Sequence, residues 1–132
     1  VRNPAALPPV TIVEITGPSA DIAREYANAH IAVLPSYREG LPKSLREAAA
    51  ASLPLIATDV PGCREVCRHD ETGLLVPARN ADALADALAR LAKDADLRAR
   101  YGAAARRAAE TEFAEAIVVA QTMALYEMLV SL

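Results

Sequence analysis

With 132 residues, the chain is long enough to bury the core of one domain and too short for two. Its 14 basic and 17 acidic residues give a formal net charge of -3. The basic residues are scattered along the expected helices, which argues against a nucleic-acid-binding surface. No segment approaches the roughly 20 uninterrupted apolar residues of a membrane span, and no signal segment is recognised. We therefore expect a cytoplasmic protein without a nucleic-acid partner.

Strands and helices are expected to alternate through the first half of the chain. Apolar, β-branched runs predict four short strands, at residues 10–15, 31–34, 55–58 and 73–76. Helical spacing predicts the helices between them, at residues 19–29, from Pro42 to a stop at Pro54, and at 62–68. Strands joined by helical crossovers imply a parallel sheet with helices on both faces. The fold class is therefore α/β, a partial Rossmann-like sheet.

The second half of the chain is expected to contain helices only. Asn80 or Asp82 suits the cap of a helix with leucines at 84, 88 and 91 on one face. A further helix begins near Asp96, and a last one spans residues 114–132 and is apolar enough to need a partner surface. We expect one partial domain over residues 1–132, with a ligand-binding part at 10–77 and helices at 80–132.

The segment after the strand at 31–34 is the candidate ligand site, because ligands of open parallel sheets bind outside the carboxyl ends of the strands. Gly40 would let a ligand approach the backbone. Pro42 suits the first turn of the next helix, with Leu45, Ala48, Ala49 and Leu53 as its inward stripe. First-turn amides carry positive partial charge and lack intrahelical acceptors. The predicted donors to a diphosphate are the amides of Leu41, Lys43 and Ser44, with the Lys43 ammonium and the Ser44 hydroxyl as helpers.

Two glutamates eight positions apart, Glu39 and Glu47, bracket this segment. Glu39 precedes the helix, where its oxygens would accept hydrogen bonds from sugar hydroxyls. Glu47 lies about one turn into the helix, within reach of ribose hydroxyls. Solvated surface charge is the alternative interpretation of both, and it is favoured for the spacing alone. The motifs around the two glutamates favour the ligand site.

Five motifs occur in a fixed order around the two glutamates. They are His30-Ile31-Ala32-Val33-Leu34-Pro35-Ser36, Glu47-Ala48-Ala49-Ala50-Ala51, Leu53-Pro54-Leu55-Ile56-Ala57-Thr58, Pro61-Gly62-Cys63-Arg64-Glu65-Val66 and Thr72-Gly73-Leu74-Leu75-Val76-Pro77. Together with the E-x7-E spacing, this series resembles the donor-binding half of retaining glycosyltransferases with the two-domain GT-B fold, of the group 1 or family 4 type. The resemblance covers residues 31–76. Ser52 and Pro61 depart from it, since the family often has glycine at both positions.

The resemblance implies what the complete protein would do. It implies transfer of a sugar from a nucleotide-diphosphate sugar to a sugar or lipid-linked acceptor, with retention of configuration and without a metal or another cofactor. It makes Glu39 the catalytic candidate and places Glu39, residues 40–44 and Glu47 at the donor, with Thr16 and Gly17 bordering the nucleobase. It also implies a cytoplasmic protein that acts at the inner membrane face in its full-length form.

Compared with that family, the chain lacks the first two strands of the donor domain and the whole acceptor domain. We therefore expect it to be inactive alone. The strands at 10–15 and 31–34 would lose the neighbours between them, so we expect strand relocation, or pairing and exchange of elements between two copies. A noncatalytic module that binds nucleotide sugar or other proteins is the alternative function. A receiver-like regulator ranks last, because no acidic cluster follows the first strand.

The cysteines do not predict a metal site. Cys63 and Cys67 lie four positions apart with His69 nearby, but the sequence offers no second cysteine pair to complete a tetrahedral site. We expect two reduced thiols.

Overall fold

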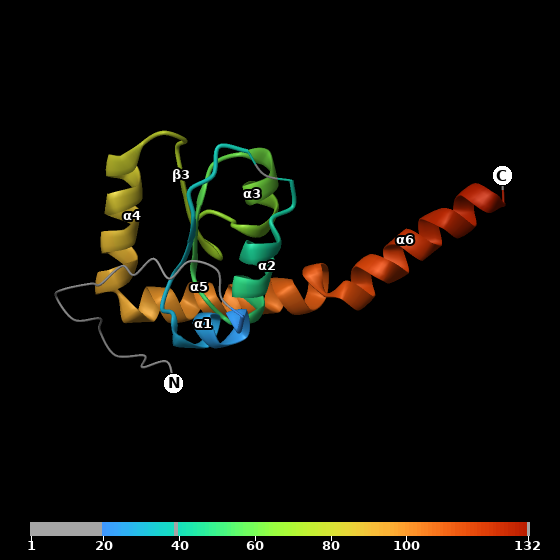
Figure 1. Cartoon of the computed structure of the whole chain (residues 1–132), viewed down its shortest axis with the longest axis horizontal. Helices are drawn as coiled ribbons and strands as arrows, with labels where there is room; N and C mark the ends of the chain where they lie inside the picture. The colour runs from blue at the N-terminus through green and yellow to red at the C-terminus, as the bar shows by residue number, and fades with distance from the viewer. Residues whose placement is uncertain (1–19, 39, 132) are drawn as a thin grey trace.

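The computed structural model describes residues 20–38 and 40–131. The strand expected at 10–15 lies outside the described residues, as do Thr16, Gly17 and Glu39. Figure 1 shows a compact body of short strands and helices, from which the last helix extends.

A three-stranded parallel sheet forms the centre of the body. Its strands are β1 (Ala32–Leu34), β2 (Leu55–Thr58) and β3 (Gly73–Val76), in the order β1-β2-β3. Ala32 pairs with Leu55, and Leu55 pairs with Gly73. Every residue of the central strand β2 is buried, as expected for a parallel strand covered on both faces. The α/β parallel fold predicted from the sequence is confirmed.

Seven helical segments surround the sheet. They are α1 (Ile22–Asn28), α2 (Lys43–Ala50), α3 (Pro61–Val66), α4 (Ala81–Lys93), α5 (Ala95–Ala108), the π-helix η1 (Ala109–Phe113) and α6 (Glu115–Val130), counted over the described residues. Helices α1, α4 and α5 each have an N-cap residue whose side chain accepts a hydrogen bond from an amide of the first turn. These residues are Asp21, Asn80 and Asp94. Asn80, and not Asp82, is therefore the cap of α4.

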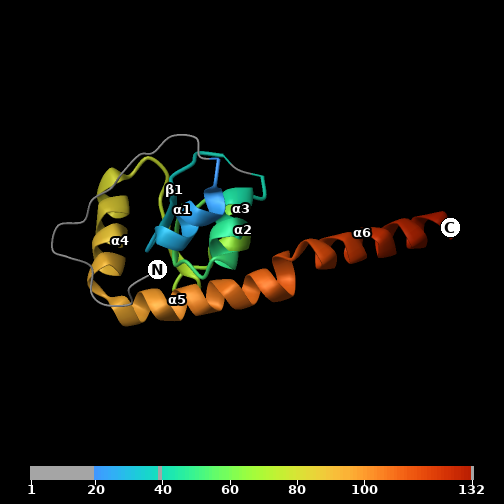
Figure 2. The ribbon, with the colours of Figure 1, turned by 60° about the horizontal axis from the view of Figure 1, so that its bottom comes forward.

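Two clusters of buried residues cover the two faces of the sheet. Leu55 and Ala57 of β2 face the cluster of α2 and α3. Ile56 points the other way, into the cluster that contains Leu91 of α4. Alternation along the strand thus places α2 and α3 on one face and α4 on the other, an arrangement visible from two directions (Figures 1 and 2).

Helix α5 runs along the amino-terminal ends of β2 and β3 and contributes to both clusters. Its fully buried Tyr101 donates a 2.9 Å hydrogen bond to Asp70, just before β3. This bond, and then the charges of His69 and Arg90, lower the pKa of Asp70. Burial raises the pKa of Tyr101, and Asp70 adds to the effect. The network fixes α5 at the end of the sheet opposite the candidate ligand site.

Two features hold α5 close to its neighbours. A Cβ on Gly102 would lie 2.3 Å from the carbonyl oxygen of Ser52, so glycine allows α5 to touch the turn after α2. The buried Arg98 donates through one nitrogen to the carbonyls of Leu91 and Ala92, at 2.7 and 2.9 Å, near the end of α4. A cation there satisfies carbonyls that have no partner within the helix.

The turn after α2 is a Schellman motif. The Leu53 amide donates to Ala48 and the Ser52 amide to Ala49, at 3.1 and 3.0 Å. Ser52 has a φ of 61°, in the left-handed region that favours glycine. Leu53 was expected on the inward stripe of the helix. It lies beyond the end of α2 and is fully buried through the turn, which corrects that expectation.

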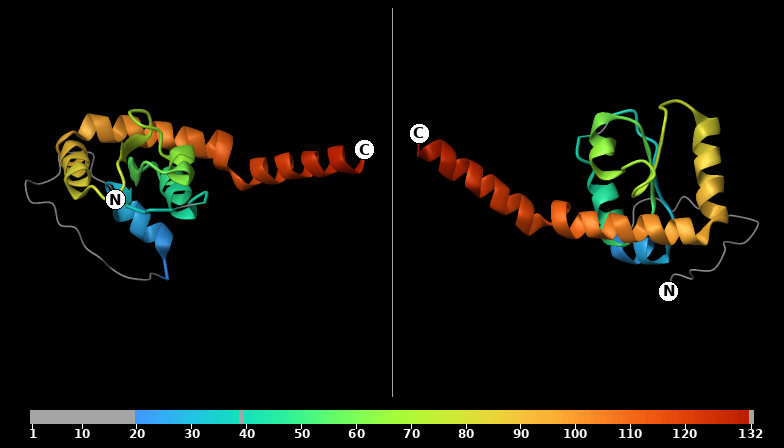
Figure 3. Two further views of the ribbon diagram at one scale, coloured as in Figure 1. Left: turned by 90° about the horizontal axis from the view of Figure 1, so that it is seen from above. Right: turned by 180° about the vertical axis from the view of Figure 1, so that it is seen from behind.

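Helix α6 leaves the body after an extended residue, Ala114, with ψ 136°. Large apolar side chains are exposed along it, including Val119, Met123 and Leu129, and it projects away in every view (Figure 3). By length and composition alone, the helical residues from Ala95 to Val130 include a stretch apolar enough to cross a membrane, which the search for an uninterrupted apolar run did not detect. One such helix is weak evidence for a membrane role, since core helices of soluble proteins pass the same test.

Candidate functional site

The amino-terminal turn of α2 lies where the sequence places the ligand, after the loop that leaves the carboxyl end of β1. Pro42 precedes the helix as its N-cap, with φ -70° and ψ 118°. It was expected inside the first turn, and its extended ψ places it one position earlier. Among the residues that the structure describes, no side chain caps α2. The amides of Lys43 and Ser44 therefore have neither an intrahelical acceptor nor a side-chain cap within the described residues.

Lys43 and Glu47 form an ion pair at this turn. Lys43 Nζ lies 3.7 Å from Glu47 Oε1, and the two side chains are 82% and 35% exposed. A lysine at the first helical position faces the positive end of the helix dipole. Lysine before glutamate is also the less favourable order for an i,i+4 pair. The stability of the helix therefore does not explain a lysine at this position. An anion bound at the turn would explain it.

Tyr26 of α1 reaches the same turn. Its hydroxyl donates to the Ser44 carbonyl oxygen at 3.2 Å. Burial raises the pKa of Tyr26, and Glu47 raises it further through its negative charge and a hydrogen bond. The sequence gave no sign of this contact, because 18 positions separate the two hydrogen-bonded residues, Tyr26 and Ser44.

The other expected site residues are described only in part. Gly40 and Leu41 are exposed on the loop before α2. A Cβ on Gly40 would meet no atom within 4 Å, which leaves room for a ligand beside the backbone. Glu39, Thr16 and Gly17 lie outside the described residues. The structure thus brings Lys43, Ser44 and Glu47 to one helix turn.

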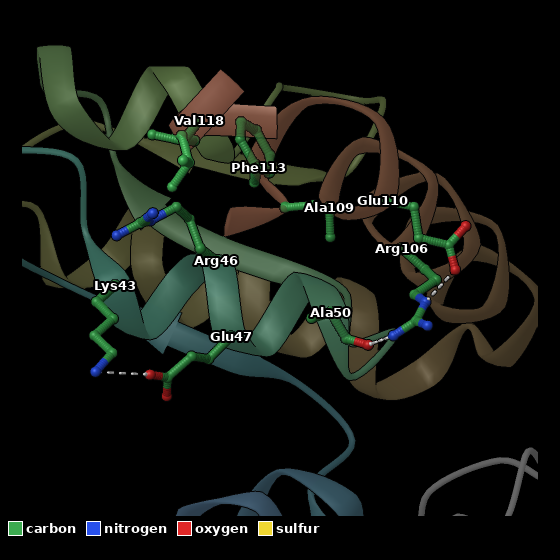
Figure 4. A pocket seen from close by; sticks show the side chains of 11 residues that line it. Lys43, Arg46, Glu47, Ala50, Arg106, Ala109, Glu110, Phe113 and Val118 are labelled. Atoms are coloured by element: carbon green, nitrogen blue, oxygen red, sulfur yellow. Dashed lines mark hydrogen bonds and ion pairs between the residues drawn. The ribbon is translucent and has the colours of Figure 1, made fainter. Parts of the chain in front are cut away.

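A groove of about 780 Å³ lies between α2 and the segment α5–η1–α6, and Lys43 and Glu47 of the candidate site are among the residues that line it. Figure 4 shows the Arg46 side chain on the same side of α2 as Val118, away from the Lys43–Glu47 pair. Arg106 donates to Glu110 at 2.7 Å and to the Ala50 carbonyl at the end of α2. Arg46 Nε is buried without a hydrogen-bond partner among the described residues. We call this space the α2 groove.

A second pocket, of about 430 Å³, lies at the carboxyl ends of the three strands. The Cζ atom of Arg79 lies over the Tyr37 ring, 5.2 Å from the ring centroid, and both residues line this pocket. The buried Thr58 lines it as well. Sequence reasoning missed these residues. The signal available was their position at or shortly after the carboxyl ends of predicted strands, where ligands of parallel sheets bind.

The cysteines belong to the core. Cys63 and Cys67 are fully buried and reduced. Burial, and then the neighbouring Cys63, raise the pKa of Cys67 to about 12, so its thiol is neutral and unreactive at ordinary pH. His69 accepts a 3.0 Å hydrogen bond from the Leu75 amide. Within residues 20–38 and 40–131, no three His, Cys, Asp or Glu side chains are grouped as a metal site requires.

The chain belongs to the glycosyl transferases group 1 family, whose pattern it matches over residues 10–108. Its parallel α/β fold is that of GT-B glycosyltransferases. It superimposes on the sucrose-phosphate synthase of Thermosynechococcus elongatus with a TM-score of 0.79 and 34% identity, over 83% of this chain and 28% of that one.

Two sequence relatives carry different names. The chain is 42% identical to an exopolysaccharide phosphotransferase of Streptomyces coelicolor, over 90% of this chain and 13% of that protein. It is 44% identical to a GDP-mannose-dependent alpha-(1-6)-phosphatidylinositol monomannoside mannosyltransferase of Mycobacterium tuberculosis, over 52% of this chain and 18% of that protein. The chain therefore spans less than a third of each compared protein.

Proposed function

We propose that this chain binds the donor in a glycosyltransferase that moves a sugar from a nucleotide-diphosphate sugar to an acceptor with retention of configuration. One observation carries the proposal. The uncapped first turn of α2 presents Lys43 and, one turn later, Glu47 at the carboxyl end of β1. An uncapped helix start with a lysine favours a diphosphate, and the adjacent carboxylate favours a polyhydroxylated group.

The residues then have separate roles. The amides of Leu41, Lys43 and Ser44 bind the diphosphate, and the Lys43 ammonium neutralises part of its charge. Glu47 accepts hydrogen bonds from the ribose hydroxyls. Glu39, assigned from the sequence, binds the transferred sugar and stabilises positive charge that develops on it. Thr16 and Gly17 border the nucleobase in this proposal. No protein nucleophile is assigned.

The relatives support the donor class without fixing the donor. One is named as GDP-mannose-dependent, which agrees with a nucleoside-diphosphate site. Another is named as a phosphotransferase, so the names together do not select one acceptor or one product. Because the chain covers a small share of these proteins, the acceptor site is proposed to lie in other parts of the complete polypeptide. The proposal includes inactivity of the chain alone and the cytoplasmic location expected from the sequence.

The test is sugar transfer by the complete polypeptide with a panel of UDP, GDP and ADP sugars. Glu39→Ala and Glu47→Ala should each reduce kcat/KM at least tenfold, because each removes a carboxylate from the donor site. Glu71→Ala is the matched control, since Glu71 is exposed and lies before β3, at the far end of the sheet.

Each outcome decides between the two functions. Loss of transfer in both site variants, with unchanged circular dichroism and a normal Glu71→Ala enzyme, supports the donor site. Full activity in both would remove these carboxylates from the mechanism. Wild-type protein that binds a nucleotide sugar and transfers nothing would favour the noncatalytic module.

A further inference from the structure

The pocket of about 430 Å³ at the carboxyl ends of the strands has no part in the proposed donor site. We call it the strand-end pocket. Ala81 and Leu84 of α4 line it, so it lies on the face of the sheet that α4 covers, whereas α2 covers the other face. Its volume falls within the range of about 300–1,000 Å³ that is typical of small-molecule sites.

The first polar group of the strand-end pocket is a buried hydroxyl. Thr58 ends β2 and is only 3% exposed. Because side chains alternate along a strand, Thr58 lies on the same side of the sheet as Ile56, the side on which α4 and the pocket lie. Among the residues that the structure describes, the Thr58 hydroxyl has no hydrogen-bond partner. A buried hydroxyl is costly to leave unpaired, and an oxygen atom of a ligand would pair it.

The second polar group is a guanidinium without a carboxylate partner. Arg79 lies between β3 and α4, and it is the only charged residue among the described residues that line the pocket. Its Cζ atom lies 5.2 Å from the centroid of the Tyr37 ring, and it forms no ion pair with a described residue. Contact with an aromatic ring restrains the guanidinium without neutralising its charge. The described lining of the pocket is therefore positively charged.

The backbone beside this guanidinium is strained and fixed. Arg79 has a φ of 55°, in the left-handed region that glycine adopts most easily, and strain of this kind is often found at ligand sites. The next residue, Asn80, also lines the pocket, and its side-chain oxygen accepts a 2.9 Å hydrogen bond from the Ala83 amide. Only the N–H donors of the Asn80 side chain then remain for a ligand. Guanidinium, amide and hydroxyl donors around one pocket favour an anion that accepts several hydrogen bonds.

We propose that the strand-end pocket binds the phosphate group of a small sugar phosphate, through the Arg79 guanidinium and the Thr58 hydroxyl. The guanidinium offers a fork of N–H donors that matches phosphate oxygens. Pro35, Pro77 and the exposed Tyr37 ring provide apolar surface for the carbon atoms of a sugar ring. The inference does not depend on the proposed donor site, because the described residues that line the pocket include none from α2.

The test is an NMR titration of the isotope-labelled chain with millimolar glucose 6-phosphate, with glucose and inorganic phosphate as comparison ligands. Glucose 6-phosphate should shift the amide resonances of Thr58 and Arg79 to saturation. Arg79→Gln should weaken this binding about tenfold or more, the effect of losing hydrogen bonds to a charged group. Thr58→Val should weaken it about two- to tenfold, whereas Thr58→Ser keeps the hydroxyl and should bind as the wild type does. Circular dichroism checks that each variant is folded.

Arg100→Gln is the matched control, because Arg100 also lies over a tyrosine ring, that of Tyr101 at 5.5 Å, and does not line the pocket. This variant should bind glucose 6-phosphate as the wild type does. Equal weakening by the two arginine variants would indicate general attraction to positive charge and would overturn the site. Absence of saturable binding would overturn it as well. Inorganic phosphate or glucose that binds as tightly as glucose 6-phosphate would overturn a sugar phosphate as the ligand.

A nucleotide titration keeps this inference apart from the proposed function. UDP, GDP or ADP should shift the amide resonances of Lys43 and Ser44 and should leave bound glucose 6-phosphate in place. Failure of all three nucleotides to bind would count against the donor site and leave the strand-end pocket unaffected. Displacement of glucose 6-phosphate by a nucleotide would show that the two ligands share one site, and would overturn a separate pocket.

Discussion

Replacing Ser52 by glycine should stabilise the fold. Ser52 lies at the left-handed position of the Schellman turn after α2, with a φ of 61°. A side chain with a Cβ is disfavoured there, by about 1–2 kcal/mol. Glycine removes this penalty and allows the backbone to keep both hydrogen bonds of the turn. Its greater freedom in the unfolded chain costs about 0.4–1 kcal/mol.

The difference is a net gain of about 0.5–1 kcal/mol in the free energy of unfolding. For a chain of this size, the gain corresponds to a rise in Tm of about 2–4 °C. Any loss of interactions made by the serine side chain would reduce this gain in the free energy of unfolding. The sign follows because relief of the left-handed strain exceeds the entropy cost of glycine.

Urea and thermal denaturation, followed by far-UV circular dichroism, measure this change. Ser52→Ala is the control, because alanine keeps the Cβ and the strain and should gain nothing. A Ser52→Gly protein no more stable than Ser52→Ala would refute the strain argument. A change in the slope against urea would indicate an altered unfolded state in place of a relaxed turn.

Two further predictions concern α5. Gly102→Ala should destabilise the fold by about 1–3 kcal/mol, because the added Cβ would overlap the Ser52 carbonyl. Gly40→Ala is the control and should change stability by less than about 0.5 kcal/mol. Equal urea midpoints for the two variants would contradict the close contact at Gly102. Tyr101→Phe should raise the Asp70 pKa in an NMR titration, because it removes the largest cause of the lowering, and an unchanged pKa would contradict the network. Because the pKa of Asp70 is lowered by folding, its carboxylate stabilises the fold at pH values above the pKa that Asp70 has in the unfolded chain. This stabilisation is lost as the pH falls through the pKa of Asp70 in the folded chain. Tyr101→Phe should therefore weaken the dependence of stability on acid pH.

Sequence patterns were sufficient to place two of the three described strands. The bounds of β2 and β3 agree with those predicted, because apolar runs bounded by proline, glycine and polar residues have no competing helical interpretation. The position of Leu53 was wrong, because the turn after α2 continues the burial of the helix without its periodicity. The turn was not recognised because Ser52, and not glycine, occupies its left-handed position.

The candidate site was predictable where its residues are close in sequence. Lys43, Ser44 and Glu47 share one helix turn, so their spacing suffices to bring them together. Tyr26 was missed because its contact depends on how α1 packs against α2, which no local pattern encodes. The contact of Arg106 with the end of α2 was missed for the same reason, because 56 positions separate Arg106 from Ala50. The contact of Arg98 with the end of α4 was missed because it depends on the angle between the consecutive helices α4 and α5.

The extended residue Ala114 divides the chain into two parts with different behaviour in experiments. The residues of both core clusters precede it, whereas α6 after it carries exposed apolar side chains. A chain that ends at Ala114 therefore retains the described sheet and core, and loses the surface most prone to self-association. Comparing the light scattering of the two lengths across concentration would separate folding from aggregation. Binding and stability measurements on the shorter chain would then report the body that carries the candidate site alone.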